Sequence, residues 1–196
     1  MRTRDKDKEA LVKQTAIEMF VNEGMENFSM NKLAKACGIS VATLYIYYKD
    51  KDDLIVQVAK EEARRMTTAI LGDFDPEMSF AEGLRFQWKT RAKFAMENIV
   101  TGQFFEQLRS SSYQDEIFQE ITEQFREPLG RFMKKAIARN EIDPMPLEVY
   151  WSIAFAPLYN LIRFSTEGRS IGGKPFTMNN KILWQTFELV LKALKK

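Results

Sequence analysis

Residue types that build many enzyme active sites are scarce in this chain. Its 196 residues contain no histidine and one cysteine, Cys37. A Ser-His-Asp triad, a zinc site of His and Cys ligands and an internal disulfide are therefore excluded within it. A single cysteine also suits a reducing compartment. Because no paired-carboxylate motif takes the place of histidine, we expect a protein that is not an enzyme and that uses no metal and no cofactor.

Long apolar runs are missing as well. The longest, Trp151 to Ile162, is interrupted by polar residues and a proline, and it falls short of the ~20 apolar residues of a membrane-spanning helix. Charged residues dominate the first ten positions, MRTRDKDKEA, so no secretory signal is predicted there. We expect a cytoplasmic protein with no membrane partner.

A strong charge imbalance is also absent. The first 54 residues hold nine basic and nine acidic side chains. No global basic field therefore indicates nucleic-acid binding, and any such binding must depend on the local placement of a few residues.

Apolar residues recur at helical spacing through the first part of the chain. Residues 5–22 carry a stripe at Val12, Ala16, Met19 and Phe20, and a second stripe follows Ser29 at Met30, Leu33, Ala34 and Cys37. Ser29 is a suitable N-cap, and Gly38 ends this second helix. Ser40 offers a new N-cap directly after it.

The segment GISVATLYIYYKDKDDL, Gly38 to Leu54, is rich in residues that favour β-strands. As a strand it would expose apolar residues on both faces and would need a partner strand, and none follows nearby. As a helix capped by Ser40 it places Val41, Leu44 and Tyr48 on one buried face. We therefore predict a helix, and with the preceding one it forms a helix-turn-helix.

In that motif the second helix enters the major groove of DNA. A tyrosine hydroxyl can donate to a phosphate oxygen without adding charge, and Thr43 is short enough to let the helix approach base edges. Tyr48 is predicted to lie in the core, and Lys49 can be read as a merely solvated lysine. Two interpretations of the basic arm stay open, a disordered tail or an additional phosphate contact, for Arg2, Arg4, Lys6 and Lys8.

The stretch from Ala16 to Leu54 resembles the DNA-binding domain of the TetR family of bacterial transcriptional regulators. The shared features are the spacing of Ala16, Phe20 and Gly24, Ser29 before Leu33-Ala34, the turn Gly38-Ile39-Ser40, Leu44-Tyr45, the aromatic Tyr48, and Lys51 with Leu54. The resemblance covers about 40 residues and implies an N-terminal DNA-binding domain joined to a variable ligand-binding domain.

By position, the resemblance implies two sets of contacts to DNA. Backbone phosphates would be contacted by Ser29, Lys32, Tyr45, Tyr47 and Lys51, and base edges by Ala42, Thr43 and Ile46. Ala42 stands where the family often has glycine, and its methyl group limits how closely the backbone meets the groove. This departure bears on sequence preference.

Helical spacing continues to the end of the chain. We predict a long connector helix from Lys51 to near Gly72, a new helix starting at Asp75-Pro76, breaks at residues 110–112 and 140–146, and final helices over Leu147–Ser165 and Thr177–Lys195. The run GRSIGGK, Gly168 to Lys174, has the spacing of a phosphate-binding loop but lacks the required Ser or Thr and a preceding strand. It is predicted to be an ordinary glycine-rich loop.

Aromatic residues and methionine are abundant, with fifteen Phe, ten Met and three Trp. Most belong to the core, and the resemblance implies that this half also holds a small apolar effector. Candidate residues of its wall are Trp88, Phe104, Phe118, Phe125, Trp151 and Phe155. Arg85, Arg91 and Glu106 are possible polar handles, although solvent-facing charge is the favoured interpretation of each.

The last two predicted helices have more apolar surface than one inner face needs, which suits a four-helix interface in a homodimer. The surplus is predicted on Tyr150, Trp151, Ala154, Leu158 and Leu161, and on Ile182, Phe187, Leu191 and Leu194.

Together these features predict an all-α protein. Residues 1–50 would form a three-helix helix-turn-helix domain, joined by a connector helix to a larger helical bundle at 51–196 that binds effector and dimerises. The expected function is that of a regulator, in the first place a repressor, which binds a palindromic operator in double-stranded DNA and is released by a small apolar effector. The alternative is a helical small-molecule carrier or interaction protein without DNA binding.

Overall fold

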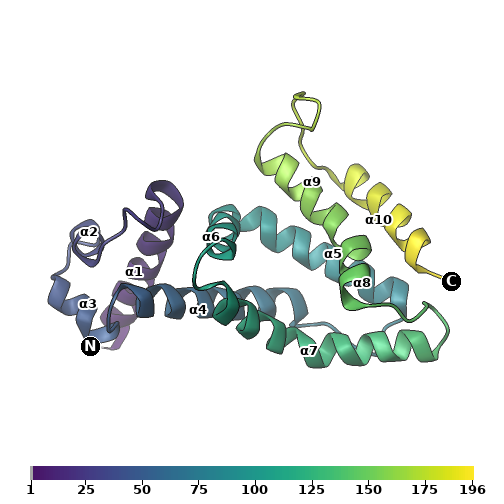
Figure 1. Cartoon of the computed structure of the whole chain (residues 1–196), viewed down its shortest axis with the longest axis horizontal. Coiled ribbons are helices and arrows are strands. Elements are labelled where there is room, and N and C mark those ends of the chain that lie inside the picture. Colours follow the sequence, from purple (N-terminus) through teal and green to yellow (C-terminus); the bar gives the residue numbers. More distant parts are fainter. Residues whose placement is uncertain (1) are drawn as a thin grey trace. The chain divides into compact units, whose positions relative to one another are not determined.

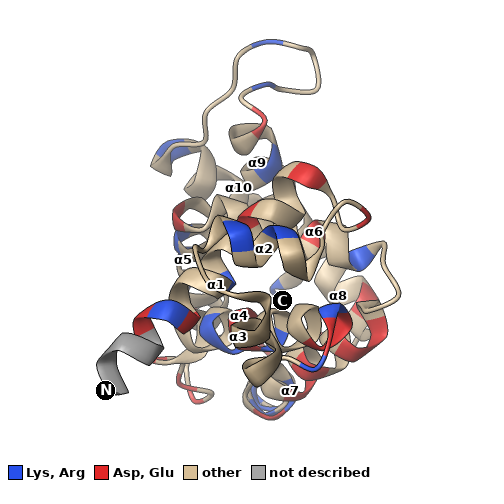
Figure 2. Ribbon diagram, turned by 90° about the vertical axis from the view of Figure 1, so that its left-hand side faces the viewer, with Lys and Arg blue, Asp and Glu red and all other residues tan. Residues whose placement is uncertain are grey.

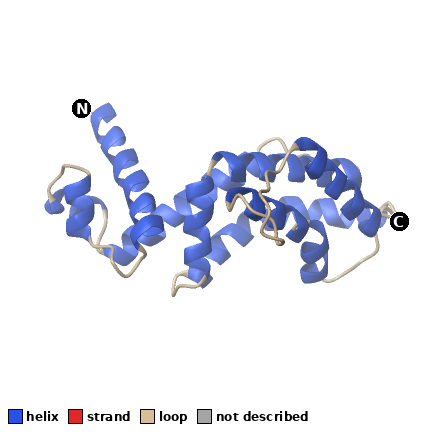
Figure 3. Cartoon of the chain, turned by 90° about the horizontal axis from the view of Figure 1, so that it is seen from above, coloured by secondary structure: helices blue, strands red, loops and turns tan. Residues whose placement is uncertain are grey.

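A computed structural model describes the backbone of residues 2–196 and the side chains of residues 7–196. Within this range the chain forms ten α-helices and no β-strand (Figure 1; Figure 3). The prediction of an all-α fold is confirmed. None of the helices in the described range has the length and apolar composition needed to cross a bilayer.

The chain divides into two compact units. The N-terminal unit comprises the residues up to Arg65 together with Val100–Ile121, and the C-terminal unit comprises Met66–Ile99 and Thr122–Lys196. The predicted boundary between residues 50 and 51 separates a DNA-binding part from an effector-binding and dimerising part. It describes function and not the packing of the chain into units, and it stays a prediction.

The N-terminal unit begins with the three helices expected from the sequence. They are α1 (Arg2–Glu23), α2 (Met30–Ala36) and α3 (Val41–Tyr47). In this unit α2 lies against both α1 and α3 (Figure 1). The long helix α4 (Lys51–Leu71) starts here and continues into the C-terminal unit, which confirms the predicted helix from Lys51 to the vicinity of Gly72.

A glycine ends α2 and sets the direction of α3. Gly38 has a φ of 65°, a left-handed conformation that side chains with a Cβ rarely adopt. The N–H of Ile39 donates to the carbonyl of Ala34 at 3.0 Å, and so satisfies one of the last carbonyls of the helix. Ser40 then caps α3 by accepting from the N–H of Thr43 at 3.1 Å. The turn predicted from these residues is therefore confirmed.

Aromatic rings from three parts of the sequence fill the core of the N-terminal unit. Phe20 of α1 packs 4.2 Å from Phe28 and 5.6 Å from Phe104, measured between ring centroids. Phe104 belongs to α6 (Ile99–Arg109), and the amide of Gln107 on the same helix donates to the carbonyl of Val21 at 3.2 Å. Helix α6 thus completes a core that α1 to α3 would leave open.

Polar contacts also join α4 to the start of α7 (Gln114–Ala138) inside the N-terminal unit. Lys60 pairs with Glu116 at 2.6 Å, and the hydroxyl of Tyr113 donates to Asp52 at 2.5 Å. Burial and the Asp52 carboxylate raise the pKa of Tyr113 to about 12, so this hydroxyl keeps its proton at neutral pH.

The C-terminal unit is built on α5 (Phe80–Glu97). Around it lie the rest of α7, α8 (Leu147–Ala154), α9 (Ala156–Thr166) and α10 (Asn180–Leu194). Trp88 of α5 is fully buried, and its indole N–H donates to the carbonyl of Ala154 at 2.8 Å. Its ring also meets Phe187 of α10 edge-on at 5.5 Å, so one side chain ties α5 to α8 and α10.

The predicted start of α5 is wrong. We expected Asp75 as N-cap with Pro76 in the first turn, but the helix starts at Phe80 after Ser79. Ser79 and Glu82 form a capping box, in which each side chain accepts from the backbone N–H of the other residue. Asp75 instead accepts from the N–H of Glu77 at 2.9 Å within a turn.

Two further predictions of helix continuity are wrong. Helix α5 ends at Glu97 and α6 begins at Ile99, a break that the aromatic spacing does not reveal. The helix predicted over Leu147–Ser165 is divided at Phe155, whose φ is −125°. The cause of this second break is Pro157, because proline has no N–H to donate within a continuous helix. The predicted loop at Gly168–Lys174 is confirmed.

Candidate nucleic-acid interface

Helix α3 has one buried face and one face that its own chain leaves open. Leu44 is 0% exposed and Tyr48 is 3% exposed, whereas Tyr45 is 53% and Ile46 76% exposed. Tyr47, at 44%, is also exposed, and so is Ala42. The prediction that this segment is a helix is confirmed, with Leu44 and Tyr48 buried as expected and Val41 only half-buried. Three consecutive large side chains therefore remain in solvent within one helical turn, a concentration that is typical of binding surfaces.

The start of α3 is fixed by two contacts of the Ser40 side chain. Its Oγ accepts from the N–H of Thr43 and lies 2.8 Å from the Thr43 hydroxyl. This arrangement holds the first turn of α3 in a single geometry. A rigid helix start is required if its side chains are to meet a groove in a fixed register.

The end of α3 is tied to α4 through Asp53. The carboxylate of Asp53 accepts from the backbone N–H of Lys49 and from the amide of Gln57, both at 2.8 Å. The Gln57 amide and the Lys49 N–H hold the pKa of Asp53 below its ordinary value of 3.8. Tyr48, between these elements, fills the core as predicted, and burial raises its pKa to about 12.

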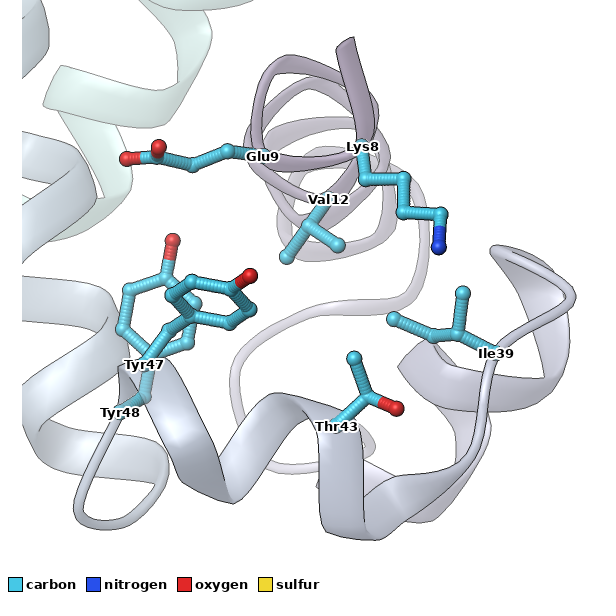
Figure 4. Close-up of a pocket in the computed structure, with 7 residues that line it drawn as sticks. All are labelled: Lys8, Glu9, Val12, Ile39, Thr43, Tyr47 and Tyr48. Carbon is cyan, nitrogen blue, oxygen red and sulfur yellow. The ribbon is translucent and has the colours of Figure 1, made fainter. Parts of the chain in front are cut away.

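Thr43 and Tyr47 border a small cavity between α1 and α3. Its lining, shown in Figure 4, consists of Lys8, Glu9, Val12, Ile39, Thr43, Tyr47 and Tyr48. Thr43, predicted to face base edges, is half-buried there, with its methyl group directed toward Val12 and Ile39. Lys8, which the sequence left between a tail and a phosphate contact, is an exposed part of α1 beside α3. The side chains of Arg2, Arg4 and Lys6 lie outside the described residues.

Basic residues stand beside α3 and not on it. Figure 2 shows lysines on α2, whereas α3 carries no charged residue. Lys32 is 54% exposed, pairs with Glu23 at 3.2 Å and donates to the carbonyl of Asn27 at 2.8 Å. Lys35, in the last turn of α2, is exposed as well and was missed from the sequence. Its place on the polar side of a short helix, between the two capping serines Ser29 and Ser40, is the sequence signal that could have identified it.

The remaining two predicted phosphate contacts differ in availability. Ser29 is the N-cap of α2 and accepts from the N–H of Lys32 at 3.3 Å, so a phosphate at this helix start would meet both groups. Lys51 is half-buried, its ammonium donates to the carbonyl of Met25 at 2.5 Å, and it lies 5.9 Å from the ring centroid of Phe28. Lys51 therefore has a structural role within the N-terminal unit.

The six predicted wall residues of an effector site fall into both units. Phe104 is in the core of the N-terminal unit, and Phe118 is 67% exposed on α7. The other four, Trp88, Phe125, Trp151 and Phe155, belong to the C-terminal unit, and the last three have rings within 5.3 Å of the guanidinium carbon of Arg91.

The solvent-facing interpretation of Arg91 is wrong, because this side chain is only 4% exposed. It is confirmed for Arg85, which pairs with Glu188 at the surface, and for Glu106, which is 71% exposed. The apolar surplus predicted for a dimer is also smaller than expected. Five of its nine residues are buried inside the unit: Tyr150, Ala154, Leu158, Phe187 and Leu194.

Two short helices, joined by a tight turn, packed on a third helix and open on one face, define a helix-turn-helix protein. Residues 12–58 match the family profile described as "Bacterial regulatory proteins, tetR family". The match lies in the N-terminal helices, in the part of the chain whose sequence resembles this TetR family.

Curated transcriptional regulators are similar to part of this chain. An uncharacterized HTH-type transcriptional regulator of Haemophilus influenzae is 35% identical over 80 residues, which cover 41% of this chain and 43% of that protein. An HTH-type transcriptional regulator of Staphylococcus aureus is 40% identical over 62 residues, 32% of this chain and 34% of that one. The chain thus matches less than half the length of these curated relatives.

The fold as a whole is similar to that of a solved structure. The crystal structure of a TetR family transcription regulator from Marinobacter aquaeolei superposes with a TM-score of 0.85 at 25% identity, with both chains covered completely. The resemblance therefore extends through all ten helices of the described range, although the family match itself covers only residues 12–58.

Proposed function

We propose that this protein is a transcriptional regulator that binds double-stranded DNA by inserting α3 into the major groove. The observation that carries the proposal is the open face of α3, where Tyr45, Ile46 and Tyr47 stay in solvent while Leu44 and Tyr48 anchor the helix. An isolated tail or loop would present such residues without a fixed geometry. Here the cap at Ser40 and the tie at Asp53 hold both ends of the helix.

In this proposal some residues of α2 and α3 contact bases and others contact phosphates. Ala42, Thr43 and Ile46 meet base edges, and the hydroxyl groups of Tyr45 and Tyr47 donate to phosphates. At the start of α2, Ser29 and Lys32 hold a phosphate of the backbone, with support from Lys35 and Lys8. We leave Lys51 out of this set, because its ammonium is engaged by the carbonyl of Met25.

A single α3 reads too few base pairs for specific regulation, so the proposed active form is a homodimer on a palindromic operator. Half-sites about 34–36 Å apart, or a multiple of that distance, would place both recognition helices on one side of the duplex. A small effector in the C-terminal unit would favour a conformation with a different half-site spacing and so release the operator, which makes repression the expected mode. An effector has this result only if it prefers one of two conformations. A regulator of this kind works in the cytoplasm, where the DNA of a bacterium lies.

The proposal is tested by selecting an operator from a random duplex library with the full-length protein, followed by gel-shift titration. Ile46→Ala is expected to weaken binding to the selected operator about tenfold or more, because an apolar base contact is lost. Ile171→Ala is the matched control, since Ile171 is 87% exposed on a loop of the C-terminal unit. Equal affinities of the two variants for the operator would contradict the role of α3.

The carrier without DNA binding is separated by the same titration at low and high salt. A regulator retains selective binding to the operator over a random duplex as salt rises, whereas weak, unselective binding that salt abolishes fits a carrier.

A further inference from the structure

The C-terminal unit buries three polar side chains whose polar atoms lack hydrogen-bond partners. The unpartnered atoms are the amide nitrogen and oxygen of Gln87, the Nε and Nη2 atoms of Arg91, and the hydroxyl oxygen of Tyr150. The exposed fractions of these residues are 0%, 4% and 4%. An unpartnered buried polar group is unfavourable, and three of them in one core are a departure that packing alone does not explain.

The three side chains face one region of the unit. Gln87 and Arg91 are four residues apart on α5 and so share a face of that helix. Phe155 connects them to Tyr150, since its ring lies 4.5 Å from the guanidinium carbon of Arg91 and 5.9 Å from the Tyr150 ring. Burial raises the pKa of Tyr150 and the nearby charge of Arg91 partly offsets this rise, as expected for neighbours. We call Gln87, Arg91 and Tyr150 the Arg91 cluster.

The guanidinium of Arg91 has only one edge left for a partner. Aromatic rings surround it at 4.5 to 5.3 Å, from Phe125, Trp151 and Phe155. Its Nη1 donates to the hydroxyl of Tyr159 at 2.9 Å. The Nε and Nη2 atoms remain, and their N–H groups point in parallel to the same side, the geometry that a carboxylate accepts with both oxygens.

The charge of Arg91 also lacks compensation. Among the described side chains no Asp or Glu forms an ion pair with it. A buried, uncompensated cation destabilises a folded protein strongly, and an anion bound from outside removes that penalty. The surrounding rings offer apolar contact, so the environment suits a molecule that carries one acid group on an apolar body.

We propose that the Arg91 cluster binds the carboxylate of a small organic acid with an apolar body, and that such an acid is the effector. The carboxylate lies on the Nε and Nη2 edge of Arg91, while Gln87 and Tyr150 hydrogen-bond the acid or a second polar group next to it. This inference rests on the proposed function of a ligand-responsive regulator, and it adds an anionic group to the apolar effector expected from the sequence.

The test begins with the full-length wild-type protein in the absence of DNA. Acetate, hexanoate, decanoate, benzoate and 4-phenylbutyrate are titrated, each beside its neutral primary amide, with calorimetry and tryptophan fluorescence as readouts. At least one carboxylate larger than acetate is expected to bind about tenfold or more tightly than its amide, because a charge-assisted bidentate contact is lost in the amide. Binding by none of the acids, or equal binding of acid and amide, would overturn the inference.

Two substitutions locate the contact. Arg91→Met, which keeps the length of the side chain, is expected to weaken binding of the best acid roughly 10- to 100-fold. Arg91→Lys keeps the positive charge but loses the planar guanidinium that can bind a carboxylate with two N–H groups. Its affinity for the acid should therefore lie between that of the wild type and that of Arg91→Met. The control is Arg85→Met on the same helix, where the arginine is exposed and pairs with Glu188. Unchanged binding in both Arg91 variants, or an equal loss in the Arg85 variant, would contradict the assignment.

Thermal unfolding distinguishes loss of acid binding from loss of folding stability in the Arg91→Met variant. Without ligand, Arg91→Met is expected to have a Tm at least equal to that of the wild type, because it removes an uncompensated buried charge. With the acid present, the Tm should rise for the wild type and not for this variant. A lower Tm of the free variant together with unchanged stabilisation by the acid would refute the cluster as the binding site.

Failure of this inference is distinct from failure of the proposed function. A protein that selects an operator but binds no acid is a regulator without the inferred site. A protein that binds the acid through Arg91 but selects no DNA has the site and is not a DNA-binding regulator, and in that case the acid is not an effector of transcription.

Discussion

The glycine at position 83 on α5 leaves no room for a larger residue. A Cβ added there would lie within 2.5 Å of the ring atom Cζ of Phe132. Phe132 is 1% exposed, and its ring packs 5.3 Å from that of Phe74 and 6.0 Å from that of Phe80. Because aromatic neighbours surround this ring, it has little freedom to move aside. The close approach of α5 and α7 therefore depends on Gly83.

Two opposing effects set the magnitude for Gly83→Ala. Overpacking a core costs about 1–3 kcal/mol, whereas alanine in place of glycine within a helix contributes about 0.5–1 kcal/mol. We expect the free energy of unfolding to fall by about 1–2 kcal/mol. Gly130→Ala on α7 is the matched control, because a Cβ at that position meets nothing within 4 Å. It should raise the free energy of unfolding by about 0.5–1 kcal/mol.

Urea unfolding followed by tryptophan fluorescence measures both variants. The three tryptophans, Trp88, Trp151 and Trp184, all belong to the C-terminal unit, so the signal reports the unit that contains both glycines. If Gly83→Ala is as stable as the wild type while Gly130→Ala is stabilised as expected, then the packing of α5 against Phe132 is not as described.

Three further predictions concern the N-terminal unit. Lys32→Ala is expected to reduce the slope of log K against log salt by about 1 per half-site, measured by gel shift, while Lys181→Ala on α10 should leave the slope unchanged. Lys51→Ala should lower the free energy of unfolding by about 1–2 kcal/mol, because its hydrogen bond to the carbonyl of Met25 is lost. It should leave the slope of log K against log salt unchanged, and a reduced slope would show that Lys51 contacts a phosphate. The lowered pKa of Asp53 means that its stabilising contribution is complete above the ordinary value of 3.8 and is lost as the pH falls through the folded-state pKa. The difference in unfolding free energy between wild type and Asp53→Asn should therefore shrink below about pH 4, and a difference that stays constant with pH would refute this role.

The sequence predicted the helices that local signals define. Ser40 caps α3 and Gly38 ends α2 through contacts among neighbouring residues, so both could be recognised without a structure. The start of α5 was misplaced because two local signals competed, and the reciprocal bonds of Ser79 and Glu82 outweigh the single bond of Asp75.

The exposure of a candidate site residue could be predicted from the sequence only where contacts within its own helix and caps determine it. The open face of α3 follows from helical periodicity and the cap. The burial of Arg91 does not, because an arginine at one helical position is compatible with either solvent or core, and its environment comes from Phe125 and Phe155 on other helices. Phe104 illustrates the same point. The sequence grouped it with the aromatic wall candidates of the second half of the chain, yet it packs on Phe20 in the N-terminal unit.

The central claim, that the outer face of α3 meets the DNA bases, is tested most directly by cross-linking. A selected operator with 5-iodouracil in place of individual thymines is irradiated in complex with the unmodified protein, and the attached peptides are identified by mass spectrometry. We predict cross-links within α3, Val41–Tyr47, from at least one position in each half-site. A bound operator whose cross-links all map to other helices would contradict the account.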